Sequence, residues 1–131
     1  MSERDGLDQQ VETFAGEQFC YLTTRGRVSG QPHTIEIWFA TSAGRVYLLS
    51  ELGEQADWVK NLRQEPEVTL RLGSLAFRAQ AHVASPGDEA LLARRLIAAK
   101  YEGWREGESL SDWAQTATPI VLEIAALTES A

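Results

Sequence analysis

The residues best suited to hold a ligand lie between two apolar segments, in the stretch Arg25-Gly26-Arg27-Val28-Ser29-Gly30-Gln31-Pro32. Gly26 and Gly30 allow the backbone to turn tightly and to approach a ligand closely. Successive amide groups in such a turn can bind an anion, and Arg27 and Ser29 add a guanidinium group and a hydroxyl. The stretch is therefore a candidate anion-binding loop. The alternative interpretation of the same spacing is a long hairpin turn with solvated arginines.

Aromatic residues form the second candidate group. The chain has four tryptophans, namely Trp38, Trp58, Trp104 and Trp113. Core packing explains aromatic residues in most positions. Tyr101 and Trp104, however, fall where a predicted helix ends and a loop begins, so we expect them to cover a flat ring ligand. Tyr101 is also the candidate proton donor, and hence the predicted catalytic residue.

Other kinds of active site are not indicated. The sequence has no nucleophile-elbow serine motif, no paired-cysteine zinc pattern and no phosphate-binding Walker loop. His33 and His82 lie on different predicted strands, so no metal site is expected. The single cysteine, Cys20, stands in an apolar run and is predicted to be buried. A lone cysteine suits a reducing compartment, which predicts a cytoplasmic protein.

Composition limits the class of protein further. The chain has 131 residues, of which 44% are hydrophobic and 24% are charged, and its formal net charge is −7. These values predict one globular domain over residues 1–131. The acidic balance argues against nucleic acid as a partner, because phosphate binding needs clustered Lys and Arg. No apolar run approaches the roughly 20 residues that a membrane span needs.

Hydrophobic periodicity predicts an α+β chain that is mainly β. Helices are expected at 7–17, 55–64, 86–101 and 110–116. Strands are expected at 19–24, 32–40, 45–50, 67–72, 75–84 and 119–125. The turns Thr41–Gly44 and Gly73–Ser74 join two hairpins. An antiparallel sheet of six strands closes readily into a barrel because closure removes exposed edges.

Several short motifs follow one another in an order that is typical of one family. They are Leu22-Thr23-Thr24-x-Gly26-Arg27-x-Ser29-Gly30-x-Pro32, Leu49-Ser50 with Gly53, Trp58-Val59-Lys60-Asn61-Leu62, Pro66-Glu67-Val68 and Thr118-Pro119-Ile120-Val121. These motifs lie between residues 22 and 121, and the likeness around them covers roughly residues 14–125. The chain resembles the deazaflavin (F420)-dependent nitroreductases, which belong to the flavin/deazaflavin-binding split-barrel superfamily. Pyridoxamine 5'-phosphate oxidase is a distant relative.

This resemblance implies a six-stranded split β-barrel with flanking helices and a set of site residues. It places a loop along the phosphate and tail of the cofactor, through Arg27, Val28, Ser29, Gly30, Pro32 and His33. Ser50 and Glu51 are expected near the phosphate, with Trp58 and Asn61 on the adjoining helix. Trp38 is expected near the ring system and the substrate, and Tyr101 and Trp104 on the substrate side.

The resemblance further implies an oxidoreductase that transfers hydride from reduced F420 to a quinone, a nitro compound or an enone. An FMN-binding oxidoreductase and a non-catalytic carrier of a flavin or tetrapyrrole are the alternatives. Three departures from the family remove positive charge from the expected site, because Val28, His33 and Glu51 stand where relatives often carry Lys or Arg. A homodimer is one expectation for Glu36 and Trp38, which lie on an outward face of the predicted strand, and packing of that face against the N-terminal helix is the alternative.

Overall fold

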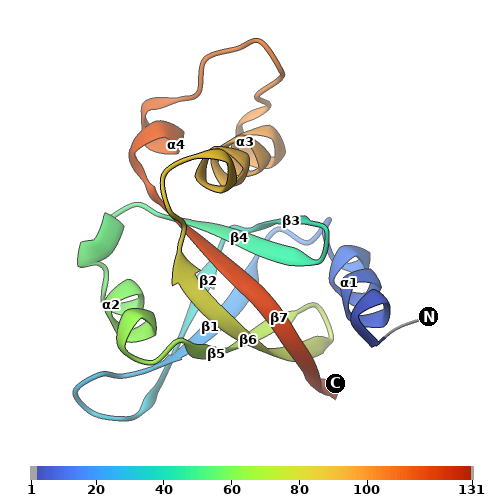
Figure 1. The fold of residues 1–131 in the computed structure, drawn as a ribbon, viewed down its shortest axis with the longest axis vertical. Helices are drawn as coiled ribbons and strands as arrows, with labels where there is room; N and C mark the ends of the chain where they lie inside the picture. Colours follow the sequence, from blue (N-terminus) through green and yellow to red (C-terminus); the bar gives the residue numbers. More distant parts are fainter. Residues whose placement is uncertain (1–2, 131) are drawn as a thin grey trace.

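The computed structural model describes residues 3–130, which form one antiparallel sheet with helices around it (Figure 1). The strands are β1 (Cys20–Arg25), β2 (Pro32–Ile37), β3 (Ala40–Ser42), β4 (Arg45–Ser50), β5 (Glu67–Leu72), β6 (Leu75–Val83) and β7 (Thr118–Ser130). The helices are α1 (Glu3–Thr13), η1 (Gly53–Gln55, a 3-10 turn), α2 (Asp57–Gln64), α3 (Asp88–Glu102) and α4 (Asp112–Thr116).

The sheet is curled into a half-barrel. Its strand order is β2-β1-β5-β6-β7-β4-β3, with antiparallel pairing throughout. Strands β2 and β3 stand at opposite ends of this order, yet only Trp38 and Phe39 separate them in the chain. The sheet must therefore curve until its two ends meet at this junction. The predicted antiparallel α+β barrel is confirmed, but it has seven strands rather than six, because the predicted strand at 32–40 is divided here.

The end of α3 holds this junction in place. The Phe39 amide donates to Tyr101 Oη at 3.0 Å, and the Phe39 carbonyl accepts from Lys100 Nζ at 3.0 Å. Tyr101 Oη also lies 2.6 Å from the carbonyl oxygen of Gln18, to which it donates. Lys100 donates as well to the carbonyl of Glu17, at 2.7 Å. Burial lowers the pKa of Lys100.

The interior of the half-barrel is apolar because alternate residues of each strand point into it. Phe39, Phe77, Leu22, Leu70 and Leu122 are fully buried there. Helices α1 and α2 close two sides with Val11, Val59 and Leu62. The last strand is longer than predicted: β7 extends to Ser130 along β6, with register shifts at Ala76/Phe77 and Arg78/Ala79. Such bulges bend a strand and increase its twist, which suits a curled sheet.

Two further sequence predictions concern single features. Cys20 is fully buried, as predicted, and burial raises the pKa of its thiol to about 12. The first helix covers residues 3–13 rather than 7–17, because the chain turns after Thr13. In the described part of the chain, no helix has the length and apolar character that crossing a membrane requires.

Candidate functional site

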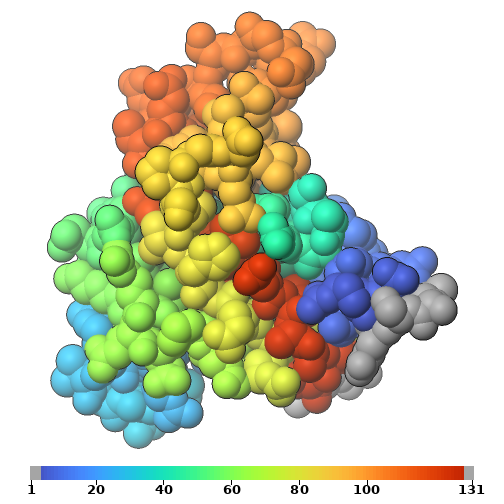
Figure 2. Space-filling view, in the orientation of Figure 1, coloured from blue at the N-terminus to red at the C-terminus, as the bar shows by residue number. Residues whose placement is uncertain are grey.

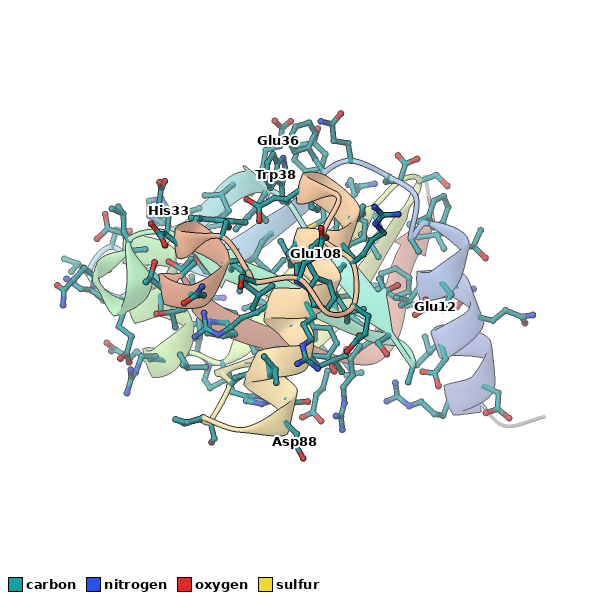
Figure 3. All side chains as sticks on the ribbon, turned by 90° about the horizontal axis from the view of Figure 1, so that it is seen from above. Glu12, His33, Glu36, Trp38, Asp88 and Glu108 are labelled. Carbon is teal, nitrogen blue, oxygen red and sulfur yellow. The ribbon has the colours of Figure 1, made fainter. Side chains whose placement is uncertain are left out.

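A pocket of about 960 Å³ opens beside the edge strand β2. Its walls come from β2, the β1–β2 loop, the turn after β4, the start of α2 and Trp113 of α4. The volume lies within the range of about 300–1,000 Å³ that is typical of small-molecule sites. Figure 2 shows the β1–β2 loop at the surface beside α2. In the view from above, His33, Glu36 and Trp38 lie along the β2 side, far from Glu12 of α1 (Figure 3).

One end of the pocket is lined by apolar side chains, both aliphatic and aromatic. Ile35 and Ile37 come from β2, and Trp38, Trp58 and Trp113 lie around them. Trp38 is stacked on Tyr101 with ring centroids 4.2 Å apart and planes 2° apart. Trp113 meets the Trp38 ring edge-on at 5.8 Å. Because Trp38 is still 36% exposed, it offers indole surface on which another flat ring can stack.

The other end of the pocket is the tight β1–β2 loop. The Gly26 amide donates to the Gln31 carbonyl at 2.8 Å, which closes the loop across its base. Ser29 Oγ lies 3.5 Å from His33 Nε2. A Cβ on Gly26 would lie 2.7 Å from Ser29 Oγ and 2.8 Å from His33 Nε2, so a larger residue there would have to displace these two side chains. The loop thus presents a hydroxyl and an imidazole to the pocket.

Arg27 connects the loop to α2. Its Nη1 donates to Asn61 Oδ1 at 2.8 Å, and its Nη2 donates to Asp57 Oδ1 at 3.1 Å. Asp57 and Asn61 are four residues apart on α2, so they share one helix face. The buried Asn61 also accepts from the Arg27 amide at 3.2 Å and donates to Thr24 Oγ1 at 3.2 Å. Asn61 is therefore the residue that fixes the loop on the helix.

The charge of the pocket is acidic. Glu36, Glu51 and Asp57 line it, and among its lining residues in the described part of the chain Arg27 is the only arginine or lysine. Glu36 accepts from Tyr21 Oη at 2.9 Å, which raises the pKa of Tyr21. Ser50 is buried and donates to the Gly53 carbonyl at 2.9 Å, which holds the turn after β4.

Most of the predicted cofactor-binding residues line this one pocket. They are Arg27, Val28, Ser29, His33, Trp38, Ser50, Glu51, Trp58 and Asn61. Gly30 and Pro32 are absent from its wall. Gly30 lies near the base of the loop, where its amide donates to the Gly26 carbonyl and its φ of +72° allows the turn, and Pro32 contributes to a separate surface depression with Thr23 and Glu65.

Two predicted substrate-side residues, Tyr101 and Trp104, do not line this pocket. Tyr101 lies behind the pocket wall, because its hydroxyl is held by the backbone of Gln18 and Phe39 and its ring is covered by Trp38. The helix α3 ends at Gly103 with a left-handed φ of +69°, which turns the chain away. Trp104 therefore donates to the Glu108 carbonyl at 2.9 Å instead of reaching the pocket.

Trp113 and Asp57 were not among the predicted site residues. Ser111 caps α4 by accepting from the Ala114 amide at 3.1 Å, and this short helix brings Trp113 back to the pocket. The sequence predicts a helix at 110–116, but it does not show that this helix lies beside the pocket. Asp57 had a clearer signal, because it precedes Asn61 by one helical turn.

Comparisons with solved structures show relatives with the same fold. A conserved hypothetical protein of Mycobacterium tuberculosis is 23% identical, with a TM-score of 0.72 over 96% of this chain and 81% of that chain. An F420-H2 dependent reductase (FDR-A) is 18% identical, with a TM-score of 0.65 over 82% and 95%. An F420 reductase is 15% identical, with a TM-score of 0.60 over 89% and 94%.

The curled antiparallel sheet and the ring-lined pocket beside its edge strand define a split-barrel protein with a candidate small-molecule site. Residues 1–123 match the model of the F420H(2)-dependent quinone reductase family, so the chain belongs to that family. The family resemblance found in the sequence is confirmed, and F420 is the cofactor that family membership assigns.

The pocket suits a deazaflavin better at one end than at the other. Trp38, Trp58 and Trp113 provide the flat apolar surface that a tricyclic ring needs. At the loop, Arg27 and the hydroxyl of Ser29 are groups that can hold one phosphate. The residues therefore fit the ring and one anionic group. A further anionic tail would be repelled by the carboxylates of Glu36, Glu51 and Asp57.

Proposed function

We propose that this oxidoreductase passes hydride from reduced F420 to a small uncharged conjugated acceptor, such as a quinone, a nitro compound or an enone. The observation that carries the proposal is the exposed indole surface of Trp38, which is held from behind by Tyr101 and from the side by Trp113. A fixed flat surface orients a conjugated ring, and correct orientation is a large part of the catalysis of group transfer.

When F420 is bound in reduced form, it supplies the hydride. The residues of this chain orient the rings and exclude water. Ile35, Ile37 and Trp58 provide apolar walls, which lower the local dielectric around the reacting atoms. Tyr101 is assigned a positioning role in this proposal, because its hydroxyl is hydrogen-bonded to the backbone of Gln18 and Phe39 and its ring supports Trp38.

The experiment that tests this proposal compares two tryptophan variants. Purified wild type, Trp38→Leu and Trp104→Leu are titrated with F420, and oxidation of F420H2 is then followed with menadione, a nitroaromatic compound and an enone. Because Trp104 lies outside the pocket, W104L should bind and turn over like wild type. W38L should bind F420 at least about fivefold more weakly, since one stacking ring is worth roughly 1–3 kcal/mol. Equal binding by W38L, or no turnover with any acceptor, would contradict the proposal.

An FMN-dependent oxidoreductase is the second candidate. The observation that favours it is the charge of the site, because FMN carries one phosphate and no glutamate tail, and Arg27 is the one arginine or lysine among the pocket residues described. Copurification decides between the two cofactors: a yellow protein whose released flavin is FMN supports this candidate. A colourless protein that binds F420 and not FMN contradicts it.

We also propose a homodimer formed through the β2 edge. This strand stands at the end of the sheet order, and Tyr21 and Glu36 are exposed on the face beside it. Edge strands are common sites of chain association. Sedimentation equilibrium of wild type and of Thr34→Pro, which removes a backbone donor from β2, tests the assembly: the variant should become monomeric. A monomeric wild type would contradict it.

A further inference from the structure

The ion pair at the loop end of the pocket has two unequal partners. Arg27 Nη2 and Asp57 Oδ1 lie 3.1 Å apart. The side chain of Arg27 is 28% exposed, whereas that of Asp57 is 85% exposed. Arg27 also has Asn61 as a second, buried partner at 2.8 Å, but the carboxylate of Asp57 lies almost entirely in water. The arginine is therefore fixed, and the aspartate can leave it easily.

This asymmetry matters because Arg27 is the only arginine or lysine on the described pocket wall. A guanidinium that already faces a carboxylate attracts a second anion weakly, since the two opposite charges largely cancel at a distance. An incoming phosphate that takes Nη2 displaces Asp57, which returns to solvent. Asn61 meanwhile keeps Arg27 in place, so the exchange needs no movement of the loop.

We propose that Asp57 is a specificity-determining residue that sets the charge of the ligands the pocket accepts. It occupies Arg27 when no ligand anion is present and competes with that anion when one arrives. Ligands with one phosphate therefore gain little from Arg27, and ligands with several negative charges are disfavoured by Asp57, Glu51 and Glu36 together. This inference rests on the proposed function, because it concerns the anionic end of the same cofactor site.

For F420 the consequence concerns its glutamate tail. Contacts of the ring with the apolar end of the pocket should not depend on the length of the tail. Each added glutamate, however, adds a carboxylate that the acidic wall of the pocket repels, which should weaken binding. The chain should therefore prefer cofactor forms with the fewest glutamates. The same reasoning favours neutral acceptors over sulfonated ones of equal ring size.

The test uses three probes that separate ring from charge. Riboflavin and FMN share one ring system and differ by a phosphate, and pyrophosphate has the charge without the ring. Dissociation constants are measured for wild type, Asp57→Asn, Glu36→Gln and the double variant Arg27→Gln/Asp57→Asn, by tryptophan quenching for the flavins and by calorimetry for pyrophosphate. D57N keeps the shape of the side chain and removes its charge. E36Q removes the same charge from the same pocket, but from a residue bonded to Tyr21 instead of Arg27.

In D57N the preference for FMN over riboflavin should rise about threefold to tenfold, and pyrophosphate should bind more tightly by a similar factor, as expected for release of a partly exposed ion pair. The double variant should lose both gains. E36Q should change the preference by less than about twofold. An unchanged preference in D57N, or an equal rise in E36Q, would overturn the role of Asp57.

The pyrophosphate measurement keeps this inference distinct from the proposed function. If neither riboflavin nor FMN binds any variant, the ring site fails and the proposed function loses its main support. Tighter pyrophosphate binding in D57N, lost again in the double variant, still supports the role of Asp57. Equal pyrophosphate binding in wild type and D57N counts against it.

Discussion

The hydroxyl of Tyr101 connects three backbone atoms of two separate segments, at Gln18 and at Phe39. It lies 2.6 Å from the Gln18 carbonyl and 3.0 Å from both the amide and the carbonyl oxygen of Phe39. We predict that Tyr101→Phe destabilises the protein by about 1–2 kcal/mol, because the Phe39 amide is left without its partner. Urea unfolding measures this change. The variant should also bind F420 more weakly, since Trp38 loses a fixed support.

Tyr21→Phe is the matched control for this prediction. The Tyr21 hydroxyl also makes a hydrogen bond, but to Glu36 on an exposed face. Its loss should change the free energy of unfolding by no more than about 0.5 kcal/mol. If Y101F and Y21F unfold at the same urea concentration, Tyr101 does not hold the β2–β3 junction.

The buried thiol of Cys20 gives a second prediction at this scale. Its pKa rises from the ordinary value of 9.0 to about 12, mainly because burial disfavours the thiolate. Between these two values the unfolded chain loses the proton and the folded chain keeps it. The contribution of Cys20 to the free energy of unfolding is therefore complete below about pH 9 and falls as the pH rises, by about 1.4 kcal/mol per pH unit.

Urea unfolding of wild type and Cys20→Ala between pH 7.5 and pH 10.5 measures this effect. The difference between the two proteins should be constant below about pH 9 and should then shrink or reverse as the pH rises. The lowered pKa of Lys100 contributes with the opposite sign in both proteins, and in Cys20→Ala this pKa is lowered further because the Cys20 charge that raises it is absent. A difference that stays constant up to pH 10.5 would show that the thiol ionises equally in both states.

At the scale of elements, two glycines should respond in opposite ways to alanine. Gly73 joins β5 to β6 with a φ of +55°, and a Cβ there would clash with the Phe14 ring. Gly73→Ala should destabilise the protein by about 2 kcal/mol or more, because the left-handed backbone and the clash add. Gly6 lies in α1 with open space around it, so Gly6→Ala should stabilise by about 0.5–1 kcal/mol.

Thermal unfolding of both variants measures the contrast. Equal shifts of G6A and G73A in the same direction would mean that neither the turn geometry nor the helix propensity decides stability at these positions.

The elements that the sequence predicted well are those fixed by local rules. The hairpin of β5 and β6 lies where alternation and the turn at Gly73 placed it. The break at Trp38 and Phe39 was missed, because Lys100 and Tyr101 hold Phe39 from more than sixty residues away along the chain. For the same reason the sequence located the loop of Arg27 and Ser29 correctly in the chain but placed Trp104, rather than Trp113, beside the pocket.

At the scale of the whole molecule, the net charge of the protein and the acidic pocket wall both disfavour anionic ligands. The chain carries 19 acidic and 12 basic residues, which gives a formal net charge of −7. An anionic ligand therefore approaches against the mean field of the protein and then meets an acidic pocket wall. Local pairing at Arg27 acts only within a few ångströms, so the long-range field should control the rate of encounter.

Salt should therefore accelerate the binding of anionic ligands to this protein. Raising the ionic strength from about 0.01 M to about 0.1 M shortens the screening length from about 30 Å to about 10 Å. We predict that the association rate constant of FMN, followed by stopped-flow quenching of tryptophan fluorescence, rises about twofold or more over this range. Riboflavin has the same ring and no phosphate, so its rate constant should not change and serves as the control. A rate constant for FMN that falls with salt would show that a positive local field at the β1–β2 loop outweighs the net charge of −7.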